Sequence, residues 1–236
     1  MQQWNSSNSV SVDIGDIKMI IIIGDSWGVG EWGFDTNEDY CLTGPGIGSL
    51  MSMHHRVINL SKCAGSNTDS LNRLTDLLDQ FTPAPGDRFF WIVTCPSRCI
   101  LSEDELYGQN FEEISTKYLF NALDRANTIA EKFSIEIELI GGVCDLPDDC
   151  YKNFKHLNVL VQSWGKLLDK NYPTCTYSPS PEILTHVLKD IEVLNRIEKK
   201  YKFWENSNLF PDNGHPNTYS HRILRDFIFP ELSHIY

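Results

Sequence analysis

Short apolar runs alternate with amphipathic stretches along most of this chain. The runs predict four strands, over Ile17–Ile23, Arg56–Leu60, Arg88–Val93 and Ile135–Ile140. The first run, IKMIIII, is apolar at nearly every position, which favours a central strand buried on both faces. Gly or Pro follows several of the runs, and these residues commonly end strands. The pattern therefore predicts a buried sheet of short strands.

Apolar residues recur at helical spacing in the stretches between and after these strands. Leucines at positions 71, 74, 77 and 78 predict a helix over Ser70–Phe81, which Pro83 and Pro85 end. The same spacing predicts helices over Tyr118–Phe133, Pro181–Tyr201 and His221–Phe229. Strands that alternate with helices are usually parallel and joined by right-handed crossovers. The predicted fold class is therefore α/β, a three-layer α/β/α sandwich with a central parallel sheet.

The composition is that of one globular domain. The chain has 236 residues and no linker-like stretch, so we expect an N-terminal extension over residues 1–16 and a single domain over residues 17–236. A net charge of −12 argues against nucleic acid as a partner. The longest wholly apolar run, Met19–Ile23, is too short for a membrane span, and the start of the chain lacks the basic region of an export signal. A cytoplasmic location is expected, and the oligomeric state is left open.

The cysteines do not indicate a disulfide scaffold or a metal site. Their number, seven, is odd, which favours free thiols. Cys95 and Cys99 form a close pair, but no second pair of Cys or His follows at zinc-site spacing. We expect neither a metal nor an organic cofactor.

A polar turn follows the first predicted strand. Ligands of open parallel sheets bind beside the carboxyl ends of the strands, and Gly24-Asp25-Ser26 occupies such an end. A serine at the start of a following helix lies where backbone N–H groups can face a developing negative charge. The alternative is an ordinary strand-to-helix turn in which Ser26 only caps the helix.

A second polar segment, FPDNGHPN over residues 210–217, follows the last long predicted helix. Asp212 and His215 are three residues apart in a turn with Gly214 and Pro216, so the carboxylate can reach the imidazole Nδ1. A histidine held in this way can remove a serine proton through Nε2. The alternative is a surface loop made of common turn residues.

The order of these two segments, with GDS near the N-terminus and D-x-x-H near the C-terminus, resembles that of the SGNH or GDSL-like hydrolases. The resemblance extends from Ile20 to about His221. It implies a flavodoxin-like SGNH hydrolase fold with Ser26 as nucleophile, His215 as general base and Asp212 as the orienting carboxylate. The chain also resembles SGNH-like proteins of large phages, and this resemblance implies association with a phage or virion as an alternative location.

Two further segments concern the oxyanion hole. The segment NLSKCAGSNT over residues 59–68 looks like the family's glycine block, which implies that Gly65 N–H donates to the oxyanion beside Ser26 N–H. The alternative is that Gly65 only shapes the turn. Many family members place Gly-x-Asn-Asp after the third strand, and its Asn is a further donor, but this chain reads VTCPSR over residues 93–98. The candidates to replace that Asn are Asn67, Thr94, Ser97 and Arg98, and Asn67 is favoured because it lies two residues from Gly65.

Other residues near these segments have mainly structural interpretations. Trp27, Trp32 and Phe34 are candidates for an apolar or sugar-stacking wall, with burial in the core as the alternative. His221 follows His215 by six residues at the start of a predicted helix, where packing is expected.

The sequence thus predicts a serine hydrolase that cleaves an acyl or acetyl ester. The expected partner is a small-molecule or carbohydrate ester substrate, and the carbohydrate follows from the resemblance alone. The alternative is a binding or structural module with weak or no hydrolysis, because the expected oxyanion Asn is absent. A phosphate-handling enzyme is disfavoured, since no GK[ST] loop follows Gly24.

Overall fold

The computed structural model describes residues 19–34, 40–63, 65–94, 111–142, 145–147, 151–168 and 215–234. Several predicted features lie outside these residues. They are the extension over residues 1–16, the start of the first strand, the helix over Pro181–Tyr201, and the side-chain candidates Asp212, Ser97 and Arg98, together with the Cys95 and Cys99 pair.

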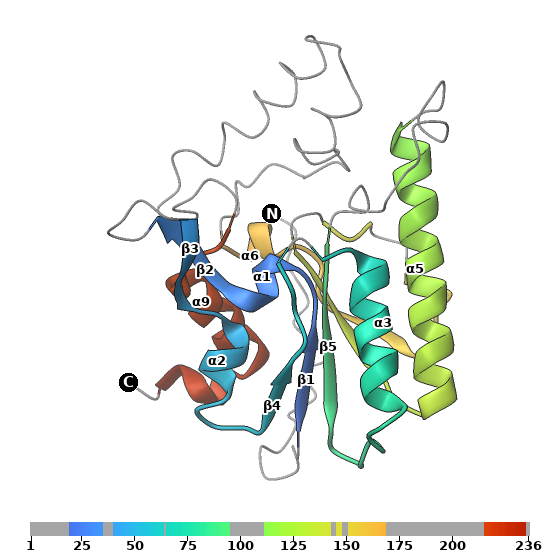
Figure 1. Ribbon diagram of the computed structural model, residues 1–236, viewed down its shortest axis with the longest axis horizontal. Coiled ribbons are helices and arrows are strands. Elements are labelled where there is room, and N and C mark those ends of the chain that lie inside the picture. Colours follow the sequence, from blue (N-terminus) through green and yellow to red (C-terminus); the bar gives the residue numbers. More distant parts are fainter. Residues whose placement is uncertain are drawn as a thin grey trace, which may run out of the picture.

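A five-stranded parallel sheet forms the centre of the molecule (Figure 1). Its order is β4-β1-β5-β6-β7, and with these strands counted along the chain it is 2-1-3-4-5, the flavodoxin-like order. The ladders pair Ile20 with both Val57 and Arg88, so β1 lies between its two neighbours in register. The predicted parallel α/β sheet is confirmed. The strands are β1 (Ile20–Ile23), β4 (Val57–Asn59), β5 (Arg88–Val93), β6 (Ile137–Gly141) and β7 (Leu157–Val161).

Helices cover both faces of this sheet, which confirms the three layers (Figure 1). On one face, Ile21 and Ile23 pack against α3 (Asn67–Leu78) and α5 (Phe111–Phe133). On the other face, Ile20 and Ile22 belong to a second core cluster. That cluster lies beneath the short helices α2 (Ile47–Met51) and α6 (Trp164–Leu168), the helix α9 (Thr218–Ile228) and the 3-10 helix η4 (Pro230–His234). Alternate residues of one strand therefore serve two cores.

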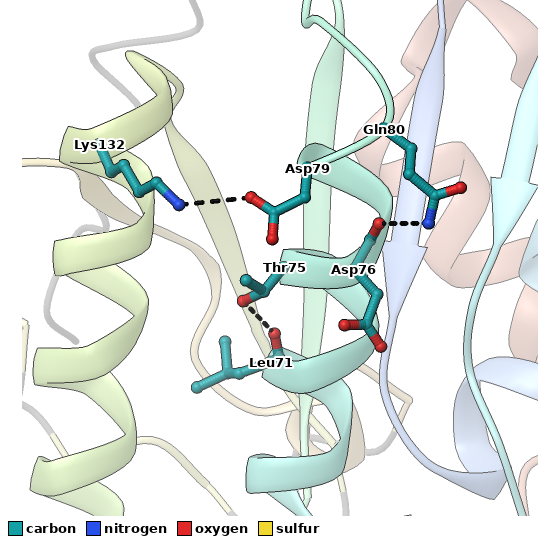
Figure 2. A network of polar contacts seen from close by, with 6 residues as sticks. All are labelled: Leu71, Thr75, Asp76, Asp79, Gln80 and Lys132. Atoms are coloured by element: carbon teal, nitrogen blue, oxygen red, sulfur yellow. Dashed lines mark hydrogen bonds and ion pairs between the residues drawn. The ribbon is translucent and has the colours of Figure 1, made fainter.

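Helix α3 begins three residues earlier than the leucine pattern predicts. The Ser66 side chain accepts from Asp69 N at 3.0 Å, and the Asp69 carboxylate accepts from Ser66 N at 3.0 Å. This capping box satisfies first-turn N–H groups that apolar periodicity does not reveal. At the other end of α3, Lys132 of α5 forms a 3.3 Å ion pair with Asp79 (Figure 2). Both partners are largely exposed, so this pair contributes little to stability.

An antiparallel hairpin that the apolar pattern did not predict precedes α2. It consists of β2 (Gly30–Phe34) and β3 (Tyr40–Pro45), and it follows the one-turn helix α1 (Ser26–Val29) directly. Its strands mix aromatic, glycine and charged residues, because the hairpin lies outside the sheet and packs against α9 instead. Within the described part of the chain, no helix is both long enough and apolar enough to cross a bilayer.

Candidate active site

Ser26 lies at the carboxyl end of β1, at the first position of α1. Its neighbour Asp25 caps this turn, because the Asp25 carboxylate accepts from Trp27 N at 3.0 Å. Both residues are almost fully buried, Asp25 at 0% and Ser26 at 1% exposure. The strand-to-helix turn was the structural alternative for this segment, and in the structure Asp25 rather than Ser26 provides the cap. The Ser26 hydroxyl is therefore left for other contacts.

The Ser26 Oγ lies 2.8 Å from Nε2 of His215. These residues are 189 positions apart in the sequence, and the fold brings them together at one edge of the sheet. His215 lies three residues before the start of α9, whose N-cap residue Asn217 accepts from Ser220 N at 2.8 Å. In the Nδ1–H tautomer, Nε2 accepts the hydrogen bond from the serine hydroxyl. Asp212, the predicted orienting carboxylate, lies outside the described residues.

The backbone just before Ser26 is held by three donors that converge on one carbonyl. Gly24 O accepts from Arg73 Nη2 at 3.0 Å, from Ser70 Oγ at 3.2 Å and from Lys62 N at 3.2 Å. Arg73 also donates through Nε to Leu60 O at 2.7 Å, so it joins the ends of β1 and β4. Burial is the main cause that lowers the pKa of the Arg73 guanidinium. No motif in the sequence indicated Arg73, whose only signal is a basic residue beside the apolar face of a helix.

A second network joins Asp25 to the end of β5. Thr94 Oγ1 donates a short hydrogen bond to the second Asp25 carboxylate oxygen. Asn67 Nδ2 donates to Thr94 O at 3.0 Å, and Thr94 N donates to Asn67 Oδ1 at 3.0 Å. All three residues are buried. Asn67 and Thr94, both candidates for the oxyanion hole, thus lie one or two hydrogen bonds from the nucleophile turn.

Gly65 is engaged in a turn. Its N–H donates to Lys62 O at 3.0 Å, so in this conformation the group that was expected to face an oxyanion has another acceptor. The geometry matches the alternative in which Gly65 shapes the turn. An oxyanion role for Gly65 requires its N–H to leave or share that acceptor.

The aromatic candidates separate into core and site. Trp27 is buried at 1% exposure and meets Trp164 edge to face, so it belongs to the core. Trp32 is half-buried, its ring centroid lies 5.9 Å from that of His215, and its Nε1 donates to Ser26 O at 3.4 Å. Trp32 therefore forms one wall of the candidate site. The Phe34 side chain lies outside the described residues.

His221 is fully buried in α9 and packs against Trp164, with ring centroids 5.0 Å apart. Burial is the main cause that lowers its pKa to about 3, with a smaller contribution from His215. The Gly30 backbone offsets part of this shift, although neither ring nitrogen has a hydrogen bond of good geometry within the described residues. His221 is therefore neutral at ordinary pH, and the packing role expected for it agrees with its position.

No group of three or more His, Cys, Asp or Glu side chains in the described ranges is arranged to hold a metal ion. The described part of the site places a serine hydroxyl beside an imidazole, in a buried turn with several hydrogen-bond donors nearby.

Comparisons with known proteins give structural neighbours only. No family model matches the chain, and no curated protein matches it. The solved structures that resemble it include a member of the lipolytic G-D-S-L family from Veillonella parvula, at 14% identity and TM-score 0.44, which covers 92% of this chain and 99% of that one. The psychrotrophic esterase EstA of Pseudoalteromonas sp. matches at 16% identity and TM-score 0.43, over 91% and 96% of the two chains.

An acetylxylan esterase from Geobacillus stearothermophilus, Axe2, matches at 12% identity and TM-score 0.42, over 92% and 94% of the two chains. Because these identities and TM-scores are low, the proposals below rest on the geometry of the site.

Proposed function

We propose that this protein is a serine esterase of the SGNH type, with Ser26 as nucleophile and His215 as general base. The observation that carries the proposal is the 2.8 Å approach of His215 Nε2 to Ser26 Oγ across 189 positions of sequence. This distance is within the range of a nucleophile–base hydrogen bond. Asp212 is the proposed orienting carboxylate, because it is three residues from His215 in the sequence.

The reaction is acyl transfer to water. His215 Nε2 takes the hydroxyl proton as Ser26 Oγ attacks the ester carbonyl carbon, and a tetrahedral oxyanion forms. The C–O bond to the alcohol then breaks, and the alcohol leaves with the proton from Nε2. Water, deprotonated by the same imidazole, releases the acyl group and restores the serine.

Asn67 is the proposed side-chain donor to the oxyanion. A side-chain amide has two N–H groups, and one of them donates to Thr94 O. The second N–H of the Asn67 amide is the group that donates to the oxyanion in this proposal. The exchange of hydrogen bonds with Thr94 fixes the amide plane, so a donor at this position is held without further reorganisation.

The proposed substrate is a short acyl ester, such as an acetyl group on a carbohydrate. The half-buried Trp32 beside His215 offers a flat apolar surface, and such surfaces pack against sugar rings. No metal or organic cofactor is needed for this chemistry.

A second candidate is an SGNH-fold binding module with little hydrolysis. The observation that favours it is the engagement of the expected donors, since Gly65 N–H donates to Lys62 O and Asn67 to Thr94 O. Loss of one oxyanion donor lowers turnover by on the order of 10²–10³.

Hydrolysis of p-nitrophenyl esters of graded acyl length separates the two candidates. The esterase proposal predicts turnover that is fastest for acetate and absent in Ser26→Ala. Ser52→Ala is the matched control, because Ser52 is exposed and its hydroxyl donates to Ser49 O. Equal hydrolysis by wild type and Ser26→Ala would contradict the proposal, and a folded wild type without turnover would favour the module.

A further inference from the structure

The β2–β3 hairpin contacts both residues of the Ser26–His215 pair. In the sequence the hairpin directly follows α1, the helix that carries Ser26. It packs against α9, which begins three residues after His215. Trp32 connects the two residues, through a 3.4 Å hydrogen bond to Ser26 O and a 5.9 Å ring contact with His215. The hairpin is therefore placed to influence the distance between nucleophile and base.

Glu31 of the hairpin accepts a hydrogen bond from the start of α9. Its Oε2 accepts from Thr218 N at 2.6 Å, and these residues are 187 positions apart. Thr218 is the first residue of α9, so its N–H has no acceptor within the helix. The Asn217 side chain caps the helix through Ser220 N. A carboxylate at this point also lies at the positive end of the helix dipole.

Residues of β3 pack closely around the contact between Glu31 and Thr218. Thr218 Oγ1 donates to Pro45 O at 3.4 Å. A Cβ at Gly44 would lie 2.5 Å from Thr218 Oγ1 and 3.0 Å from Glu31 Oε2. Glycine at this position leaves the room in which the start of α9 meets the hairpin.

We propose that Glu31 is a positioning residue that fixes His215 against Ser26 through the first N–H of α9. His215 lies three residues before Thr218, with Pro216 and Asn217 between them, so a shift of the helix start shifts the imidazole. The inference rests on the proposed esterase function. If it is correct, a hairpin that lies outside the sheet contributes to the esterase activity.

The test compares the kinetics with which a fluorophosphonate probe labels Ser26 in a set of variants. Glu31→Ala removes the acceptor, and Glu31→Gln keeps an oxygen acceptor of the same length. Asp87→Ala is the matched control. Asp87 is also half-buried, and its carboxylate also accepts a backbone N–H, that of Ala84 at 2.8 Å, but it lies at the amino end of β5, away from the site.

A positioning role predicts that Glu31→Ala lowers the maximal labelling rate by roughly ten- to hundredfold, since misplacement by about 1 Å has effects of this size. The probe concentration at half-maximal rate should change less than about twofold, because the probe-binding surface is intact. Glu31→Gln should retain a rate within about threefold of wild type, and Asp87→Ala should label as wild type does.

Two results would overturn the inference alone: wild-type labelling of Glu31→Ala, or equal slowing in Asp87→Ala. Absence of labelling in wild type itself would instead overturn the proposed function, and the inference with it. If Glu31→Ala does not fold, Thr218→Pro provides the same test. Proline is favoured at the first helical position and removes the N–H, and Asn217 before it has the extended ψ of 173° that a following proline requires. Wild-type labelling of folded Thr218→Pro would then overturn the inference.

Discussion

The two sides of the candidate site are built differently. The serine side is part of the sheet and its core: Asp25 and Ser26 are buried, Gly24 O accepts from three donors, and Thr94 closes the network from the next strand. The histidine side is peripheral. His215 is half-buried, and the contacts around it come from the start of α9 and from the hairpin. Changes on the serine side should therefore have the larger effect on stability, whereas changes at the start of α9 should slow the reaction at a smaller cost in stability.

The largest effect is expected on the serine side, from Asp25→Ala. This change leaves the Trp27 N–H and the Thr94 hydroxyl without their buried acceptor. Each unsatisfied group costs about 1–3 kcal/mol, so the loss of acceptor for these two groups should lower the free energy of unfolding by roughly 2–6 kcal/mol. Urea unfolding measures this change.

Asp76→Ala is the control for Asp25→Ala, because Asp76 is exposed on α3. Its effect should be within about 0.5 kcal/mol. A folded Asp25→Ala variant of wild-type stability would show that the serine side is not built as described.

The next effect is the response of α9 to acid. The folded pKa of His221, about 3, lies below its ordinary value of 6.5, so the unfolded chain binds this proton first as the pH falls. The stabilising contribution of neutral His221 is complete above pH 6.5 and is lost between pH 6.5 and pH 3, at up to about 1.4 kcal/mol per pH unit.

Unfolding of wild type and His221→Phe at pH 7 and pH 5 isolates this contribution. Wild type should lose about 2 kcal/mol more than the variant over this interval. Leu224→Met is the control, because Leu224 is buried in the same helix and carries no titratable group, so this variant should keep the pH dependence of wild type. Parallel pH profiles for wild type and His221→Phe would contradict the buried, neutral state of His221.

The smallest effect on stability is expected from two helix caps, one on each side of the site. Asn217→Ala removes the cap of α9, and Ser66→Ala removes the cap of α3. Each should lower the free energy of unfolding by about 1 kcal/mol. Only Asn217→Ala should also slow fluorophosphonate labelling several-fold, because His215 lies two residues away, whereas Asn67, next to Ser66, stays held by its two hydrogen bonds with Thr94. Equal labelling rates in the two variants would remove the proposed difference between the two sides.

Much of the fold could be predicted from the sequence because it depends on apolar periodicity. The strand over Arg88–Val93 has the predicted bounds, and the run around Ile20 is an interior strand paired on both sides. The hairpin was not predicted, since its residues contact α9 rather than the sheet and carry no periodic signal. Strand β7 was missed for a related reason, because it lies at the edge of the sheet and exposes Asn158.

Residues of the candidate site that lie in short sequence motifs could be predicted. Residues that act through contacts with distant parts of the chain could not. Ser26 and His215 lie in recognisable short segments, and the fold brings them together. Arg73 and Glu31 act through backbone groups 49 and 187 positions away, and no pattern in the sequence marks such partners. The turn bond of Gly65 to Lys62 O likewise follows from backbone geometry rather than from residue type.

Mass spectrometry of the intact protein after fluorophosphonate treatment shows whether Ser26 is the nucleophile. If it is, wild type carries one adduct, located on Ser26 by peptide mapping, and Ser26→Ala carries none. In His215→Ala, labelling should be slower by on the order of a hundredfold or more, because the base that activates the hydroxyl is absent. A folded wild-type protein that forms no adduct, or an adduct that persists in Ser26→Ala, would contradict the assignment of Ser26 and His215 as nucleophile and base.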